Sequence, residues 1–215
     1  MGLLFFPRGG SAQVTRYLAA ALPAHGWDAT VLAGSLGDPG DEAHAATFFD
    51  GLDVVPVPYD EALTAADPLR ADPPLHPSYE DRAGAPDRVF ASVDDDTYEH
   101  LVEAWIGHLE RAGAADADVL HLHHLTPMNE AAARAFPDKP VVGHLHGTEL
   151  LMLREIEMGL HPGWPHADEW FARMRRWAAR CRLLFVLSPD ARRRAPVLLG
   201  RRLLLRERLS LSVRV

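Results

Sequence analysis

Five of the 12 histidines in this chain lie in two short motifs, HLHH and HLHG. The first motif contains His121, His123 and His124, and the second contains His144 and His146. Side chains two positions apart in a strand share one face of a sheet, so His121 and His123 share a face, as do His144 and His146. We expect His123 and His146 to meet where two neighbouring strands end.

Two interpretations of these histidines are open. Imidazole is a common ligand of zinc and iron, and the further ligands of a hydrolytic site could come from Asp116, Asp118 or Glu149, which lie nearby in the sequence. Alternatively, His121 and His144 are core histidines with hydrogen-bond partners inside their strands. We favour the second interpretation and expect no bound metal.

A glycine pair, Gly9-Gly10, follows the first apolar run and precedes the first helical pattern. Backbone N–H groups at such a turn can face an anion, although a tight turn alone also favours glycine. The chain lacks the phosphate-binding motifs GxGxxG and GxxxxGK and the nucleophile motif GxSxG. Cys181 lies between two arginines, and a buried thiol is the simpler interpretation of it.

Apolar runs and helical patterns alternate along the chain and must position these residues. We predict strands over 3–6, 29–33, 52–57, 118–122, 140–145 and 183–187. We predict helices over 11–25, 94–111, 129–136, 149–158 and 167–180, and a last helix from residue 188. This alternation is typical of an α/β domain with a mostly parallel sheet and helices on both faces. Ligands of such sheets bind at the carboxyl ends of the strands, here after Phe6, Leu122, Leu145 and Leu187.

Residues 58–93 interrupt this alternation, because they contain six prolines and many acidic residues. A loop of this length is functional, disordered, or contains a short element of its own, and the sequence does not distinguish these cases.

The composition is typical of a soluble, packed protein, with 47% apolar and 24% charged residues. The single cysteine excludes an internal disulfide framework and a multi-cysteine zinc site. No apolar run approaches the ~20 residues that span a bilayer, and no basic residue precedes the first apolar run, as it would in a secretory signal. We therefore expect a cytoplasmic protein with no integral membrane segment.

The net charge of −8 is distributed unevenly. Residues 192–215 contain eight arginines and one glutamate, a charge of +7, so residues 1–191 carry −15. An acidic body argues against nucleic acid as a partner. We interpret the basic end as Arg-rich sequence beyond the fold rather than a binder of anionic surfaces.

Four segments in this order resemble family 4 retaining glycosyltransferases. They are RGGSAQVTRYLAAALPAHGWDATVLAGS, DADVLHLHHLTPMNEAAARAF, PVVGHLHGTELLML and RCRLLFVLSPDARRRAPVLLG. The resemblance covers most of residues 3–200, apart from 58–93. It implies the GT-B architecture, in which two Rossmann-like domains face a cleft. Residues 1–200 would be the N-terminal, acceptor-side domain, and 201–215 an Arg/Leu-rich tail without a counterpart in the family.

The resemblance also implies roles for single residues. The family transfers a sugar from a nucleotide-diphosphate donor with retention of configuration and without a metal ion. Gly9 and Gly10 would approach the donor diphosphate, and His146 would stabilise charge that develops on the transferred sugar. The acceptor, a small molecule or a glycan, would be lined by His124, Thr126 and Glu149.

The chain departs from the family after Gly200, where the family continues into a linker and a donor-binding domain. We expect an acceptor-binding half of the enzyme that is weakly active or inactive alone. It could be a truncated or frameshifted gene product, an isolated domain, or a half-enzyme that pairs with a separate donor-binding domain. We favour the truncated or frameshifted product. Glu149 and Glu157 match the E-x7-E donor motif of the family formally. We interpret the match as coincidence, because eight positions on a helix rotate a side chain by about 80°.

Other classes of function are open. One is a non-catalytic binding module whose cleft face mediates self-association. Another is a metal-dependent hydrolase that uses the HLHH and HLHG histidines. A third is a different GT-B enzyme, such as a sugar epimerase or a phosphorylase.

Overall fold

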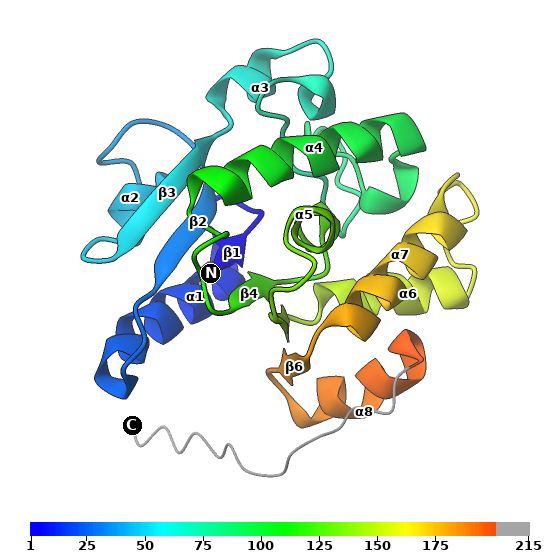
Figure 1. Ribbon diagram of the computed structural model, residues 1–215. Coiled ribbons are helices and arrows are strands. Elements are labelled where there is room, and N and C mark those ends of the chain that lie inside the picture. The colour runs from blue at the N-terminus through cyan, green and yellow to red at the C-terminus, as the bar shows by residue number, and fades with distance from the viewer. Residues whose placement is uncertain (201–215) are drawn as a thin grey trace.

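A computed structural model describes residues 1–200 (Figure 1), so the predicted tail, 201–215, lies outside the described residues. Within residues 1–200, six parallel strands form one sheet in the order β3-β2-β1-β4-β5-β6. The strands are β1 (Gly2–Leu3), β2 (Thr30–Ser35), β3 (Asp53–Pro58), β4 (Leu120–His123), β5 (Val141–Leu145) and β6 (Leu183–Val186). Helix α1 covers one face, and α4 and α5 cover the other. The predicted fold, a Rossmann-like α/β domain with a parallel sheet, is confirmed.

Local capping explains where several helices begin. Asp94 accepts a hydrogen bond from the N–H of Thr97 (2.8 Å), and Ser188 accepts one from Ala191 (3.1 Å). Such acceptors satisfy N–H groups that have no partner inside the helix. The helices are α1 (Gly9–Ala21), α2 (Ala45–Phe48), α3 (Asp60–Thr64), α4 (Asp95–Arg111), α5 (Pro127–Ala135), α6 (Thr148–Glu157), α7 (Ala167–Arg180) and α8 (Pro189–Leu199). None of these helices is long and apolar enough to cross a membrane.

Strand β1 is shorter than the predicted strand over 3–6. Most of the apolar run is nevertheless buried, since Leu3 and Leu4 have no exposed surface and Phe5 is 8% exposed. The chain leaves the sheet after Leu3, and the Phe5 ring packs edge-on against the ring of His124 at 5.0 Å. The apolar run therefore predicts which residues are buried, but only Leu3 of this run belongs to a strand of the sheet.

Residues 58–93 are a packed part of the domain. They contain α3 and two short 3-10 helices, Pro68–Arg70 and Phe90–Ser92. The Tyr79 hydroxyl donates a hydrogen bond to the Leu125 carbonyl (2.8 Å), just after β4. His76 is 1% exposed and contacts Phe5 edge-on at 4.8 Å. The Pro-rich segment thus lies against the carboxyl edge of the sheet.

Candidate functional site

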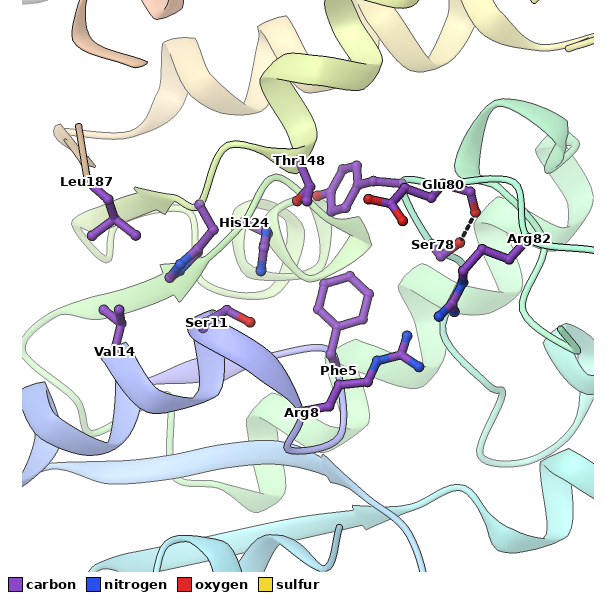
Figure 2. A pocket seen from close by; sticks show the side chains of 13 residues that line it. Phe5, Arg8, Ser11, Val14, Ser78, Glu80, Arg82, His124, Thr148 and Leu187 are labelled. Atoms are coloured by element: carbon purple, nitrogen blue, oxygen red, sulfur yellow. Dashed lines mark hydrogen bonds between the residues drawn. The ribbon is translucent and has the colours of Figure 1, made fainter. Parts of the chain in front are cut away.

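A cavity of about 370 Å³ opens at the carboxyl edge of the sheet, near β1 and β4. The strand order reverses between these two strands, and α/β sheets bind ligands at such a point. All four predicted ligand loops contribute side chains, together with the start of α1 and the 58–93 segment (Figure 2). The lining residues are Phe5, Arg8, Gly10, Ser11, Val14, Ser78, Tyr79, Glu80, Arg82, His124, His146, Thr148 and Leu187.

The start of α1 borders this cavity. Gly9 has a φ of +68°, a left-handed conformation that favours glycine. A Cβ atom added to Gly9 or Gly10 would meet nothing within 4 Å, so the surface beside the pair is open. The first turn contains no acidic residue, and Arg8 at the N-cap makes no side-chain capping hydrogen bond. The first N–H groups of α1 are therefore available to an anion.

Four imidazole rings form a row across β4 and β5. The rings of His121, His123, His144 and His146 stack with centroid separations between 4.9 and 5.5 Å. Nδ1 of His123 lies 2.9 Å from Nε2 of His146, which confirms that the two meet at the strand tips. Burial is the largest cause that lowers the pKa of each ring, to about 3 for His121 and His146 and to about 4 for His144. All four imidazoles are therefore neutral at pH 7.

A chain of close polar contacts runs from α1 through His123 to His146. The Thr15 hydroxyl donates to the Ser11 carbonyl (2.9 Å), and its oxygen lies 3.2 Å from Nδ1 of His123. Nδ1 of His123 thus lies within hydrogen-bond distance of two groups, the Thr15 hydroxyl and Nε2 of His146. Nδ1 of His146 is buried and has no hydrogen-bond partner within residues 1–200.

The same histidine row is a poor metal site as it lies. Ligand atoms of His121, His123 and His144 lie within 4.8 Å of one another, and within residues 1–200 no Asp or Glu joins this group. The three ring planes are within 17° of parallel. Because the lone pair of an imidazole nitrogen lies in the ring plane, the three lone pairs do not converge on one point. The rings would have to rotate before they could share an ion.

Glu149 is fully buried beneath the HGT segment. Its carboxylate accepts the backbone N–H groups of His146 (3.0 Å) and Gly147 (2.8 Å) and lies 3.4 Å from Nδ1 of His124. Burial by itself raises the pKa of this carboxyl, but the interactions with His124 and with the N–H of His146 outweigh it, and the pKa falls to about 2. A charged carboxylate therefore holds the HGT loop and the His124 ring together.

Of the three residues predicted for the acceptor side, only His124 lines the cavity. Thr126 is 1% exposed and precedes α5, where its backbone N–H donates to the side chain of Asn129 (2.8 Å). Thr126 and Glu149 therefore lie behind the cavity wall. His124 is 4% exposed, has a φ of +66°, and its Nε2 lacks a partner within the described residues. Such strained backbone is found mostly at functional sites.

No sequence motif predicted that Arg8 and four residues of the 58–93 segment would line the cavity. From this segment come Ser78, Tyr79, Glu80 and Arg82. They belong to no motif and to no periodic element, so no local pattern marks them. Their position depends on how the segment folds back over the sheet.

Comparison with known protein families gives a match to Glycosyltransferase Family 4 over residues 8–200. The match covers almost all of the described domain, including the start of α1, the histidine row and the HGT segment. No curated protein matches the chain.

Proposed function

The chain belongs to glycosyltransferase family 4, and we propose that it is the acceptor-binding domain of a retaining enzyme that transfers a sugar from a nucleotide-diphosphate donor. One observation carries this proposal: the family match spans a cavity at the switch point of the sheet, where the start of α1 meets His146. The glycosyltransferase domain itself is established by the match, whereas the donor, the stereochemistry and the residue roles are proposed.

The donor diphosphate would lie against Gly9 and Gly10. Open space beside both glycines, the uncapped first turn of α1 and its helix dipole favour a bound anion there. The absence of side chains would let the diphosphate approach the backbone N–H groups closely.

His146 would act on the transferred sugar as a hydrogen-bond donor. The residue lines the cavity, its Nδ1 is buried without a hydrogen-bond partner within residues 1–200, and burial lowers the pKa of the ring to about 3. A donor held by His123 and by the Glu149-bound loop needs no reorganisation when charge develops on the sugar, which is the basis of electrostatic stabilisation. This role requires no metal ion, and we propose that the enzyme uses none.

The acceptor, a small molecule or a glycan, would enter the remaining cavity beside His124. Thr126 and Glu149 would support this side from behind, without contacting the acceptor. We further propose that a donor-binding domain closes the cleft, either in a longer chain or in a separate one. Residues 1–215 alone would then transfer sugar slowly, because half of the positioning contacts would be missing. A reducing cytoplasm suits the single cysteine, and we propose this location.

Transfer from nucleotide sugars tests the proposal. The 215-residue chain is incubated with UDP-, GDP- and ADP-sugars and a sugar acceptor. Slow release of the nucleoside diphosphate should report transfer to an acceptor hydroxyl, and NMR of the glycoside product should show a retained anomeric configuration. His146→Ala should lower the rate by roughly a hundredfold or more. His161→Ala, at a half-exposed histidine between α6 and α7, is the matched control and should leave the rate unchanged. Failure to bind or consume any nucleotide sugar would contradict the function, and an inverted product would contradict the retaining mechanism.

A further inference from the structure

Two arginines from distant parts of the chain meet at one side of the cavity. Arg8 precedes α1 and Arg82 belongs to the 58–93 segment, and a nitrogen of each contacts the same carboxylate oxygen of Asp87. Figure 2 shows both guanidinium groups on the side of the cavity formed by Ser78 and Glu80, opposite Val14 and Leu187. We propose that this pair binds an anionic group, a phosphate or a carboxylate, carried by the acceptor; this inference rests on the proposed transferase function.

Asp87 holds the pair in place without using up its donors. The carboxylate is only 5% exposed, whereas each arginine side chain is 40% exposed. A guanidinium has five N–H donors in a planar fork. Within residues 1–200, Asp87 is the only hydrogen-bond partner of either arginine side chain, and Arg8 also packs over the Phe6 ring at 4.5 Å. Most N–H donors of both groups are therefore free for a ligand, and a fixed fork matches phosphate and carboxylate geometry.

The buried Asp87 compensates only one of the two arginine charges, whereas Glu80, which opposes the other, is exposed and screened by solvent. The uncapped start of α1 adds positive potential at Arg8. Burial is the largest cause that lowers the pKa of Arg8, the neighbouring charge of Arg82 lowers it further, and Asp87 raises it. A bound anion would reduce the repulsion between the two arginines.

A second observation points to a ligand in the same cavity. His124 also lines the cavity, with a side chain that is only 5% exposed, and its buried Nε2 has no partner within residues 1–200. A buried, unpaired ring nitrogen is costly unless a ligand or water satisfies it. An acceptor held by its anionic end at Arg8 and Arg82 would bring hydroxyl groups toward His124.

Binding of small probes to the 215-residue chain tests the proposal without requiring turnover. Calorimetric titrations use glucose 6-phosphate, glucuronate and inorganic phosphate as anionic probes, glucose as the neutral one, and UDP for the donor side. We expect at least one anionic sugar to bind about tenfold or more tightly than glucose. Arg82→Gln should remove this advantage and leave the affinity for UDP within about twofold. Arg8→Gln should act in the same direction.

Arg88→Gln is the matched control, since Arg88 pairs with the half-exposed Asp67 and does not line the cavity. It removes the same charge from the same segment and should leave all affinities unchanged. Thermal unfolding checks that each variant is folded. If Arg8→Gln does not fold, the proposal is decided by Arg82→Gln alone, because in that variant Arg8 still compensates the charge of Asp87.

Three results would overturn the inference: no anionic probe binds, glucose binds as tightly as glucose 6-phosphate, or Arg82→Gln weakens UDP as much as the anionic sugar. The last result would assign the arginines to the donor diphosphate. Failure of the transferase proposal is a separate outcome, in which the anionic sugar binds through Arg82 but the chain binds no nucleoside diphosphate.

Discussion

Glu149 is the residue on which the arrangement of the HGT segment depends most directly. A carboxylate without exposed surface requires compensating donors, and Glu149 accepts the backbone N–H groups of His146 and Gly147, while Nδ1 of His124 lies 3.4 Å away. These partners belong to the loops after β4 and β5. One buried charge therefore sets the relative position of two histidines that line the cavity.

Replacing this charge by an amide tests the role of Glu149. In Glu149→Gln, one of the two acceptor oxygens becomes an NH2 group that cannot accept from the backbone N–H of His146 or Gly147. We expect the free energy of unfolding, measured by urea titration, to fall by about 1–3 kcal/mol, the cost of a buried donor without a partner.

Glu157→Gln provides the matched control on the same helix. Glu157 is exposed, so its substitution should change stability by less than about 0.5 kcal/mol. Equal effects of the two substitutions would mean that the buried carboxylate does not organise the loop.

For single residues, the sequence predicted which side chains lie on the same side of an element better than it predicted which atoms they contact. The i, i+2 spacing correctly predicted that His123 and His146 meet, because strand periodicity alone fixes the side of the sheet. The rotation of about 80° over eight helical positions separated Glu149 from Glu157, which the structure finds buried and exposed respectively. The sequence did not reveal that Glu149 points inward, since the direction depends on the helix start at Gly147 and on the loop after β4.

Among the elements, β2 has to lie unusually close to its neighbours. A Cβ atom on Gly34 would lie 2.3 Å from the Tyr59 ring and 2.8 Å from the backbone of both Leu4 and Phe6. The Tyr59 hydroxyl donates to the Leu4 carbonyl (2.6 Å), so the ring is held against the strand. Gly34 thus allows the chain after β1 and the start of the 58–93 segment to pack on β2.

Gly34→Ala should therefore destabilise the domain. Neither the Leu4 nor the Phe6 backbone can move without disturbing β1, so we expect a loss of about 1–3 kcal/mol in the free energy of unfolding, typical of overpacking. Gly163→Ala, where an added Cβ meets nothing within 4 Å, should be nearly neutral. An unchanged urea midpoint for Gly34→Ala would contradict the tight packing.

Elements were predictable where the pattern is periodic. All six strands and the long helices were located from apolar runs and helical patterns, and the structure shows that Asp94 and Ser188 cap the helices that follow them. The 58–93 segment was not, because its α3 helix has only five residues and its 3-10 helices three each. The 58–93 segment contributes residues such as Arg82 to the cavity because Tyr79 and His76 pack against distant parts of the chain. No local sequence pattern predicts this packing.

For the whole molecule, the burial of the histidines makes stability depend on pH. The pKa values of His121, His144 and His146 are lowered to about 3, 4 and 3, and that of His123 lies well below its usual range, with burial as the main cause. In the unfolded chain the same rings titrate near pH 6.5. Between these values the unfolded state binds protons that the folded state does not, so stability is complete above pH 6.5 and is lost as the pH falls toward 4.

We therefore expect the free energy of unfolding to fall steadily between pH 6.5 and 4, by up to about 1.4 kcal/mol per pH unit for each buried histidine. His144→Leu should lower the slope by about one proton, because His144 packs beside Phe185 and an apolar side chain can replace it. His25→Leu, at an exposed histidine, should leave the slope unchanged. A free energy of unfolding that stays constant from pH 7 to 5 would contradict the burial of the histidine row. If His144→Leu has the same pH slope as the unsubstituted protein, His144 is not one of the groups that take up a proton on unfolding.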